Sequence, residues 1–290
     1  MPAHHSKGFP MIIAQLSDFH ARPHGNPAYG IVETNPAIER AVDEILKLEP
    51  RPDCVLVTGD LSDCGLPEEY GIVRAALKRL PMPVYVIPGN HDRRDSFARE
   101  LRPDHPYLPQ AGFLHYIIDD FPVRLIGLDT VVAGEDGGEI CAEREAWLAG
   151  QLAQGQGKPT VIFMHHPPFP VGVDGMDIMP CQVSPGFACL IADHPEIERV
   201  LCGHYHRPIQ LRFAGTIGYV VPGTAHQVAL DLRPGTENRF VMEPPALALH
   251  VWRPGLGLVS HLQPIGDYGP RRDFVLDPAY PGKPQTVPAR

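Results

Sequence analysis

Five short, mostly apolar runs, each followed closely by Asp, Asn or His, constrain the fold of this chain most strongly. These pairs are Met11–Leu16 with Asp18 and His20, Cys54–Thr58 with Asp60, Val84–Ile87 with Asn90, Thr160–Met164 with His165, and 199–202 with His204 and His206. Such runs predict buried strands. Open α/β sheets bind ligands beyond the carboxyl ends of their strands, so the five fragments are predicted to converge on one site.

Helical patterns lie between these runs. Asn35 can cap, and Pro36 can begin, a helix whose apolar residues follow a roughly helical period. Further helices are predicted at 68–80, 143–154 and 186–192, and another strand at 124–128. Because strands alternate with helices, we expect a layered α/β fold.

After His206 the sequence no longer alternates predicted strands with predicted helices. A hairpin is predicted at 209–221, an exposed loop at 236–245, and alternating apolar residues at 246–262 predict further strands. Beyond Asp267 the density of Pro, Gly and Arg predicts an extended tail. We therefore expect a core at 11–234 with a cap or hairpin insertion at about 207–226, and remaining core strands with a C-terminal cap and tail at 235–290.

Composition narrows the range of partners. The 290 residues include 25 Lys and Arg against 34 Asp and Glu, a net charge of −9, without a long basic stretch. Broad binding to nucleic acid is therefore not expected. Residues 1–10 are polar and no run is apolar enough to span a membrane, so we expect a cytoplasmic protein without a membrane partner.

The six cysteines are scattered without a paired metal-binding spacing. In a chain of this length they are typical of small buried side chains. The sequence leaves open whether Cys54 and Cys64 form a disulfide.

The polar residues of the five fragments suit metal chemistry. Carboxylates, an amide and neutral imidazoles can hold Fe, Mn, Co or Zn, and Asp60 is a natural bridge between two ions. Metals about 3.5–4 Å apart orient a phosphoryl group and lower the pKa of a bound water to about 7. The expected nucleophile is then a bridging hydroxide, and no serine or cysteine nucleophile is needed.

Each fragment alone has a simpler interpretation. Asp18 could cap a helix, and Gly89-Asn90-His91-Asp92 could be a turn before one. His204 and His206, one residue apart on an extended segment, would lie on the same side. Five such fragments in one chain together predict metal binding.

These fragments, in this order, resemble the calcineurin-like metallophosphoesterase superfamily, and within it the bacterial class III phosphodiesterases. The nearer resemblance is to the glycerophosphodiesterase branch, over about 11–269, and it thins after Pro234. It is carried by Tyr29-Gly30-Ile31-Val32, Cys64-Gly65-Leu66-Pro67-Glu68-Glu69-Tyr70, Phe163-Met164-His165-His166-Pro167-Pro168 and Pro222-Gly223-Thr224-Ala225-His226-Gln227-Val228. The resemblance implies a four-layer α/β sandwich of two mixed sheets flanked by helices, and a homo-oligomer formed through a small cap.

The family pattern also implies a ligand set. One metal would be held by Asp18, His20, Asp60 and His206, and the other by Asp60, Asn90, His165 and His204. His166 would orient its loop. His91 matches the position that contacts the phosphate or protonates the leaving alkoxide, although a structural role is an alternative.

Asn90 and Arg22 are further candidates for substrate contact. Arg22 follows the first ligand pair and could touch a phosphate oxygen or simply lie at the surface. His226 could face the site, although we expect it to serve packing.

We therefore expect a binuclear phosphodiesterase that hydrolyses small phosphodiesters, with glycerophosphodiesters preferred and 3′,5′-cyclic nucleotides as the alternative. A protein Ser/Thr phosphatase would need Arg where Cys64 stands, and a nuclease would need a strand-binding surface. The alternative from another class is a noncatalytic metal-binding scaffold, which loss of a ligand would favour. No ligand of the pattern is missing.

Overall fold

Two mixed β-sheets form the centre of the molecule in this computed structural model, which describes residues 10–155 and 157–272. The first sheet has the order β15 (Gly257–Pro264), β14 (Ala246–Arg253), β1 (Met11–Leu16), β2 (Cys54–Thr58), β3 (Val84–Ile87). The second has the order β10 (Ile209–Phe213), β11 (Thr216–Val220), β9 (Ile197–Cys202), β7 (Thr160–Met164), β5 (Arg124–Leu128), β4 (Tyr116–Ile118).

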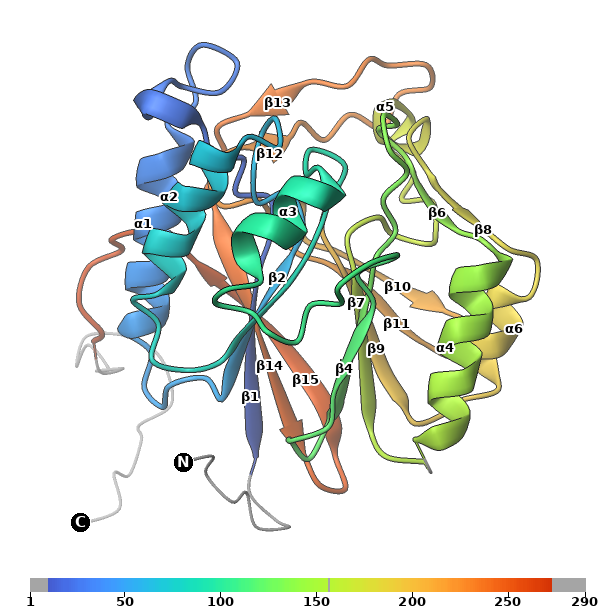
Figure 1. The fold of residues 1–290 in the computed structure, drawn as a ribbon. Coiled ribbons are helices and arrows are strands. Elements are labelled where there is room, and N and C mark those ends of the chain that lie inside the picture. Colours follow the sequence, from blue (N-terminus) through green and yellow to red (C-terminus); the bar gives the residue numbers. More distant parts are fainter. Residues whose placement is uncertain (1–9, 156, 273–290) are drawn as a thin grey trace, which may run out of the picture.

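Helices cover the outer faces of the two sheets (Figure 1). On the side of the first sheet lie α1 (Thr34–Leu46), α2 (Pro67–Leu77) and α3 (Arg94–Leu101), and on the other side lie α4 (Ala142–Gln154) and α6 (Phe187–Ala192). The short helices are η1 (Pro23–Gly25) and α5 (Asp174–Asp177). This helix–sheet–sheet–helix arrangement confirms the predicted four-layer sandwich.

Continuous apolar runs place the central strands in the core. Every residue of β2, β5 and β7 is buried, as expected for strands covered on both faces. In α1 the buried residues Ile38, Val42 and Ile45 share one helical face against the first sheet. The strands predicted at 124–128 and 160–164 are confirmed to the residue.

The start of the first helix differs from the sequence prediction. We expected Asn35 to cap it, but α1 begins at Thr34 and its N-cap residue is Glu33. The Asn35 side chain instead accepts a hydrogen bond from the Arg22 backbone N–H and donates one to the Arg22 carbonyl oxygen, at 2.9 and 2.7 Å. Asn35 thus fixes the loop after β1 rather than the helix end.

The hairpin after the last predicted ligands continues a sheet. We expected a cap or hairpin insertion at about 207–226: β10 and β11 form a hairpin there, β11 pairs in parallel with β9, and β10 forms the sheet edge. The role of this segment as a cap stays a prediction. The ribbon of β12 (Gln227–Val228) and β13 (Phe240–Val241) lies at the end of the molecule where β1 and β2 finish (Figure 1). A second ribbon joins β6 (Gly138–Ile140) to β8 (Cys181–Val183).

The C-terminal third contains the predicted strands β14 and β15, and the 236–245 segment is largely exposed, with β13 inside it. Most of the predicted tail, 273–290, lies outside the described residues. The boundary between 234 and 235 stays a prediction. All six cysteines, Cys54 and Cys64 included, carry free thiols.

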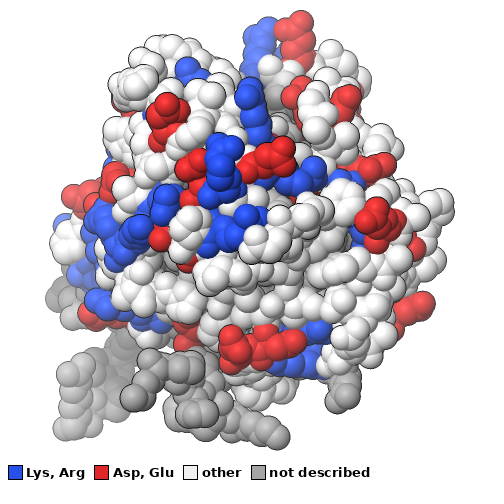
Figure 2. Space-filling model, in the orientation of Figure 1, with Lys and Arg blue, Asp and Glu red and all other residues white. Residues whose placement is uncertain are grey.

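The surface agrees with the balance of charges in the sequence. Acidic and basic side chains are interspersed over the face drawn in Figure 2. In the part of the chain that the structure describes, no helix has the length and apolar character needed to cross a membrane.

Candidate metal centre

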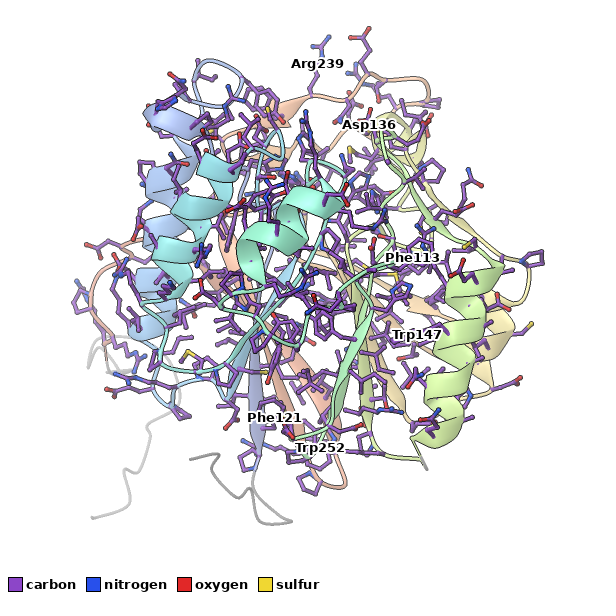
Figure 3. The ribbon with its side chains drawn as sticks, viewed as in Figure 1. Phe113, Phe121, Asp136, Trp147, Arg239 and Trp252 are labelled. Carbon is purple, nitrogen blue, oxygen red and sulfur yellow. The ribbon has the colours of Figure 1, made fainter. Side chains whose placement is uncertain are left out.

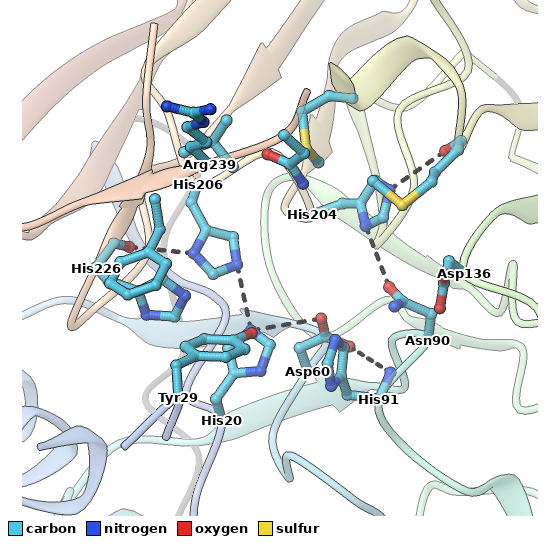
Figure 4. Close-up of a pocket in the computed structure, with 15 residues that line it drawn as sticks. His20, Tyr29, Asp60, Asn90, His91, Asp136, His204, His206, His226 and Arg239 are labelled. Carbon is cyan, nitrogen blue, oxygen red and sulfur yellow. Dashed lines mark hydrogen bonds and ion pairs between the residues drawn. The ribbon is translucent and has the colours of Figure 1, made fainter. Parts of the chain in front are cut away.

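The seven predicted metal ligands meet at one end of the sandwich, beyond the carboxyl ends of β1, β2, β3, β7 and β9. Figure 4 shows His20, Asp60, Asn90, His204 and His206 around the cavity beside this centre. Their side chains come from loops far apart in sequence, as the strand pattern predicted. All except Asn90 are buried. The site therefore holds a dense set of polar atoms largely removed from water.

One group of donors surrounds His20. Its Nε2 lies 3.2 Å from Nε2 of His206 and 3.6 Å from Oδ2 of Asp60. Nε2 of His206 is also 3.2 Å from Oδ1 of Asp18. These nitrogens and carboxylate oxygens converge on one small volume.

A second group adjoins the first through Asp60. Oδ2 of Asp60 lies 3.4 Å from Nε2 of His165, which is 3.0 Å from Oδ1 of Asn90. The same Asn90 oxygen lies 3.1 Å from Nδ1 of His204. Asp60 thus faces both groups, the position that a bridging carboxylate requires.

The outer nitrogen of each imidazole is held by an acceptor outside the donor groups. The pairs are His20 Nδ1 with Asp63 Oδ1 at 3.2 Å, His206 Nδ1 with the His226 carbonyl at 3.1 Å, His165 Nδ1 with the Thr58 carbonyl at 2.7 Å, and His204 Nε2 with the Met179 carbonyl at 3.3 Å. A carbonyl oxygen only accepts hydrogen bonds, so the nitrogen facing it carries the proton. In a neutral ring the inner nitrogen therefore presents a lone pair to the centre, and where the pKa is raised, as at His165, a proton holds that position until a metal ion displaces it.

This arrangement fits bound cations. Facing lone pairs, such as those of His20 and His206, repel one another unless a positive charge lies between them. Asp18 Oδ2 is buried and has no hydrogen-bond partner among the described residues, which is unfavourable for a carboxylate oxygen. The combination of nitrogen and oxygen donors suits borderline divalent ions.

The electrostatics favour positive charge in the same place. Burial would lower the pKa of His165, but the charges of Asp60 and Asp18 outweigh it and raise the pKa to about 9. Burial would raise the pKa of Asp18, but His206 outweighs it and lowers the pKa to about 2. The carboxylates thus stay ionised and attract cations.

Backbone strain concentrates at this centre. Eight described residues other than glycine have positive φ, and five of them are predicted ligands: Asp18, His20, Asp60, His204 and His206. Such conformations are costly for these residues and typical of functional sites. The folded chain therefore holds these side chains in place at the expense of local stability.

Residues 11–208, more than half of the chain, match the family model for calcineurin-like phosphoesterases. The chain belongs to the calcineurin-like phosphoesterase family. A probable glycerophosphodiester phosphodiesterase of Arcobacter nitrofigilis is 37% identical over 89% of this chain and 94% of its own length. A glycerophosphodiester phosphodiesterase of Enterobacter lignolyticus is 37% identical over 83% of this chain and 86% of its own.

More distant relatives carry other names. A probable cyclic nucleotide phosphodiesterase of Rhodopseudomonas palustris is 32% identical over 75% of this chain and 79% of its own. A dimetal phosphatase of Danio rerio shares the fold, with a TM-score of 0.57 at 15% identity over 88% of this chain and 99% of the other.

Two acidic residues that sequence reasoning did not single out support the site of this phosphoesterase. Asp63 accepts from His20 and from Arg22 Nη1, at 3.2 and 2.8 Å. Asp92 accepts from the backbone N–H groups of Leu61 and Gly89, at 3.1 and 3.0 Å, and so joins the loops of Asp60 and Asn90. The position of Asp92 inside Gly89-Asn90-His91-Asp92 was an available signal for its role, and so was the position of Asp63 three residues after Asp60.

The structure also shows the surroundings of the other predicted site residues, His91, Arg22 and His166. His91 lines the cavity beside the centre, and its Nδ1 donates to the Asp63 carbonyl at 2.9 Å. Arg22 pairs with Asp63 and is not among the described residues that line this cavity, so its contact with substrate stays a prediction. His166 Nδ1 lies 2.7 Å from Thr130 Oγ1, and the His166 ring packs against the rings of His165 and His204, with 4.7 Å between centroids in each pair.

A cavity of about 400 Å³ opens onto the predicted ligands. The cavity is also lined by Met176 and Met179 and by Asn238, Arg239 and Phe240 from the segment that contains β13. Asp136 and Arg239 lie at the end of the molecule that carries β13 (Figure 3). His226, which we expected to serve packing, is buried and also lines the cavity.

Proposed function

We propose that this phosphoesterase hydrolyses small phosphodiesters, and glycerophosphodiesters in particular, at a centre of two divalent metals. The observation that carries the proposal is the pair of buried donor groups that share Asp60 and turn their lone pairs inward. The preference for glycerophosphodiesters is supported by relatives named for that activity, which align along most of this chain.

The proposed ligands follow the two groups of donors. Asp18, His20, Asp60 and His206 would hold one ion, and Asp60, Asn90, His165 and His204 the other. Fe, Mn, Zn and Co all accept such donors. When bound, two such ions supply Lewis-acid polarisation of the phosphoryl oxygens and a lowered pKa for an attacking water.

We assign His91 to the leaving alcohol. Burial would lower the pKa of His91, but the charge of Asp60 and the hydrogen bond to the Asp63 carbonyl raise it above its usual value. A ring held at Nδ1 by that carbonyl can present a protonated Nε2 to the departing alkoxide oxygen. Asn90 also lines the cavity, and we propose that its side-chain amide both binds a metal and contacts the substrate.

Two alternative functions differ from this proposal, one in the substrate and the other in the class of protein. Hydrolysis of 3′,5′-cyclic nucleotides is favoured by the relative named for that activity at 32% identity. A noncatalytic scaffold is disfavoured because none of the seven expected ligands is missing. Cytoplasmic location and assembly through a cap stay predictions.

The proposal is tested by kcat/KM on manganese-loaded protein for glycerophosphoethanolamine and 3′,5′-cyclic AMP in parallel. We expect a clear advantage for the glycerophosphodiester, since kcat/KM measures discrimination between transition states. A higher kcat/KM for cyclic AMP would leave the proposed metal mechanism standing but would identify cyclic nucleotides as the substrate. If the native protein and Asn90→Ala hydrolyse both diesters equally slowly, the two-metal mechanism is wrong.

A further inference from the structure

A buried amide, that of Gln15, joins the two sheets beneath the metal centre. Gln15 lies in β1 of the first sheet and is fully buried, although the rest of that strand is apolar. Its Nε2 donates to Thr58 Oγ1 at the end of β2, at 3.1 Å, and to the Cys202 carbonyl at the end of β9, at 3.0 Å. Because β9 belongs to the second sheet, we call these two hydrogen bonds the inter-sheet link.

The oxygen of the same amide is held by His250 in β14. His250 Nε2 lies 3.0 Å from Gln15 Oε1, and His250 Nδ1 lies 2.7 Å from Ser260 Oγ in β15. The Cys202 carbonyl only accepts hydrogen bonds, so the amide nitrogen of Gln15 faces it and the amide oxygen faces His250. Every polar atom of the Gln15 side chain therefore has a partner, and the inter-sheet link has one orientation.

The inter-sheet link holds the backbone close to two predicted ligands. Thr58 is the last residue of β2, and its carbonyl accepts a hydrogen bond from Nδ1 of His165 at 2.7 Å. Cys202 is the last residue of β9, two positions before His204. Through Thr58 and Cys202, the Gln15 amide is tied to the second donor group, which contains both of these histidines.

The position of one sheet relative to the other matters for metal binding, because each donor group takes residues from both sheets. Strands of the first sheet lead to Asp18, His20, Asp60 and Asn90, and strands of the second lead to His165, His204 and His206. Metal–ligand distances tolerate deviations of about 0.2 Å. Apolar contacts between the sheets are non-directional, whereas hydrogen bonds fix both distance and angle. A directional link near the site therefore preorganises the donors.

We propose that Gln15 is a positioning residue of the metal centre, whose inter-sheet link sets the affinity for the ion of the second donor group. This inference rests on the proposed two-metal function and adds a residue that contacts neither metal nor substrate. The Cys202 carbonyl also accepts from the Val221 backbone N–H, at 3.1 Å. Loss of the amide would therefore spare this contact within the second sheet and remove the link between the sheets.

The test titrates chelated protein with manganese and records the two binding steps. Asn90 belongs to the second donor group alone, so the step that Asn90→Ala weakens identifies the ion of that group. Gln15→Met keeps the length of the side chain but removes the amide. We expect Gln15→Met to weaken the same step by about 10-fold, the lower end of the range for partners that orient a ligand, and to leave the other step nearly unchanged.

A purely structural role would change stability without changing metal affinity. Gln15→Met leaves the buried Nε2–H of His250 without its acceptor, which destabilises the fold, and adding His250→Leu removes that donor. In urea unfolding of the chelated protein, we expect the double variant to regain stability but to keep the weakened metal affinity. Leu148→Ala, in the buried face of α4, is the control that lowers stability and should leave both binding steps unchanged.

The outcomes separate this inference from the function on which it rests. Native affinity at both steps in Gln15→Met would overturn the positioning role alone. Recovery of metal affinity together with stability in the double variant would also overturn it, because the effect would then follow stability. A native protein that shows no second binding step would overturn the two-metal function and this inference with it.

Discussion

The imidazoles of the metal centre are oriented by acceptors that contact no substrate. Asp63 is the one carboxylate among the four acceptors, and it holds Nδ1 of His20 so that Nε2 faces His206 and Asp60. Such partners fix the tautomer and raise the basicity of a ligand. The orientation of His20 should therefore depend on Asp63.

We predict that Asp63→Ala weakens metal affinity by about 10- to 100-fold, the usual effect of losing such a partner. Asp63→Asn should restore part of it, because its amide oxygen still accepts from His20. Metal titration of the chelated protein measures both effects. Asp231→Ala is the control, because the Asp231 carboxylate pairs with Arg233 and belongs to neither donor group. An Asp63→Ala protein with native affinity would rule out this role.

At the scale of the loops, glycines allow the strand ends to approach one another. A Cβ on Gly89 would lie 2.2 Å from Asp60 Oδ1 and 2.5 Å from the Asp60 backbone nitrogen. Gly89 has no positive φ, so the constraint there is steric rather than conformational. The side chain that would move is the proposed metal bridge.

Gly89→Ala is expected to lower metal affinity and phosphodiesterase kcat/KM by about 100-fold or more, comparable to the loss of a key catalytic electrostatic contact. Gly71→Ala in α2 is the matched control, because an added Cβ there meets nothing within 4 Å. That control should be neutral or stabilise the helix by about 0.5–1 kcal/mol. Bound metal per chain and kcat/KM should be measured for both variants, and equal values would refute the steric account.

The sequence predicts the strands and the ligand residues because both depend on local patterns. Buried strands such as Thr160–Met164 can be predicted because nearly all of their residues are apolar. A polar residue after each such run indicates the sheet edge that the strands share. The support given by Asp92 was not predicted, since it joins loops that meet only after folding. The hairpin at 209–221 was predicted, but its pairing with β9 was not, because a hairpin pattern does not say which sheet edge it joins. Asn35 was taken as a cap because its competing partner, the Arg22 backbone, is set by the tertiary fold.

At the scale of the whole molecule, buried histidines remote from the metals couple stability to pH. His250 is fully buried between Gln15 and Ser260, and burial lowers its pKa from 6.5 to about 3. Between those two values the unfolded chain binds the additional proton. The free energy of unfolding should therefore fall as the pH drops below about 6.5.

We predict that His250→Gln reduces the slope of unfolding free energy against pH by about 1.4 kcal/mol per pH unit between pH 4 and 6. Urea unfolding of the chelated protein at a series of pH values measures this slope. Replacing the exposed His24 by Gln is the control and should leave the slope unchanged. An identical slope for the native protein and His250→Gln would show that His250 is not held neutral.

The central claim is a catalytic centre that needs two metal ions. The most direct measurement titrates chelated protein with manganese while recording bound metal and the initial rate on glycerophosphoethanolamine. The account predicts no activity without metal and a rate that reaches its plateau at two ions per chain. Full activity in the chelated protein, or a plateau at one ion per chain, would contradict it.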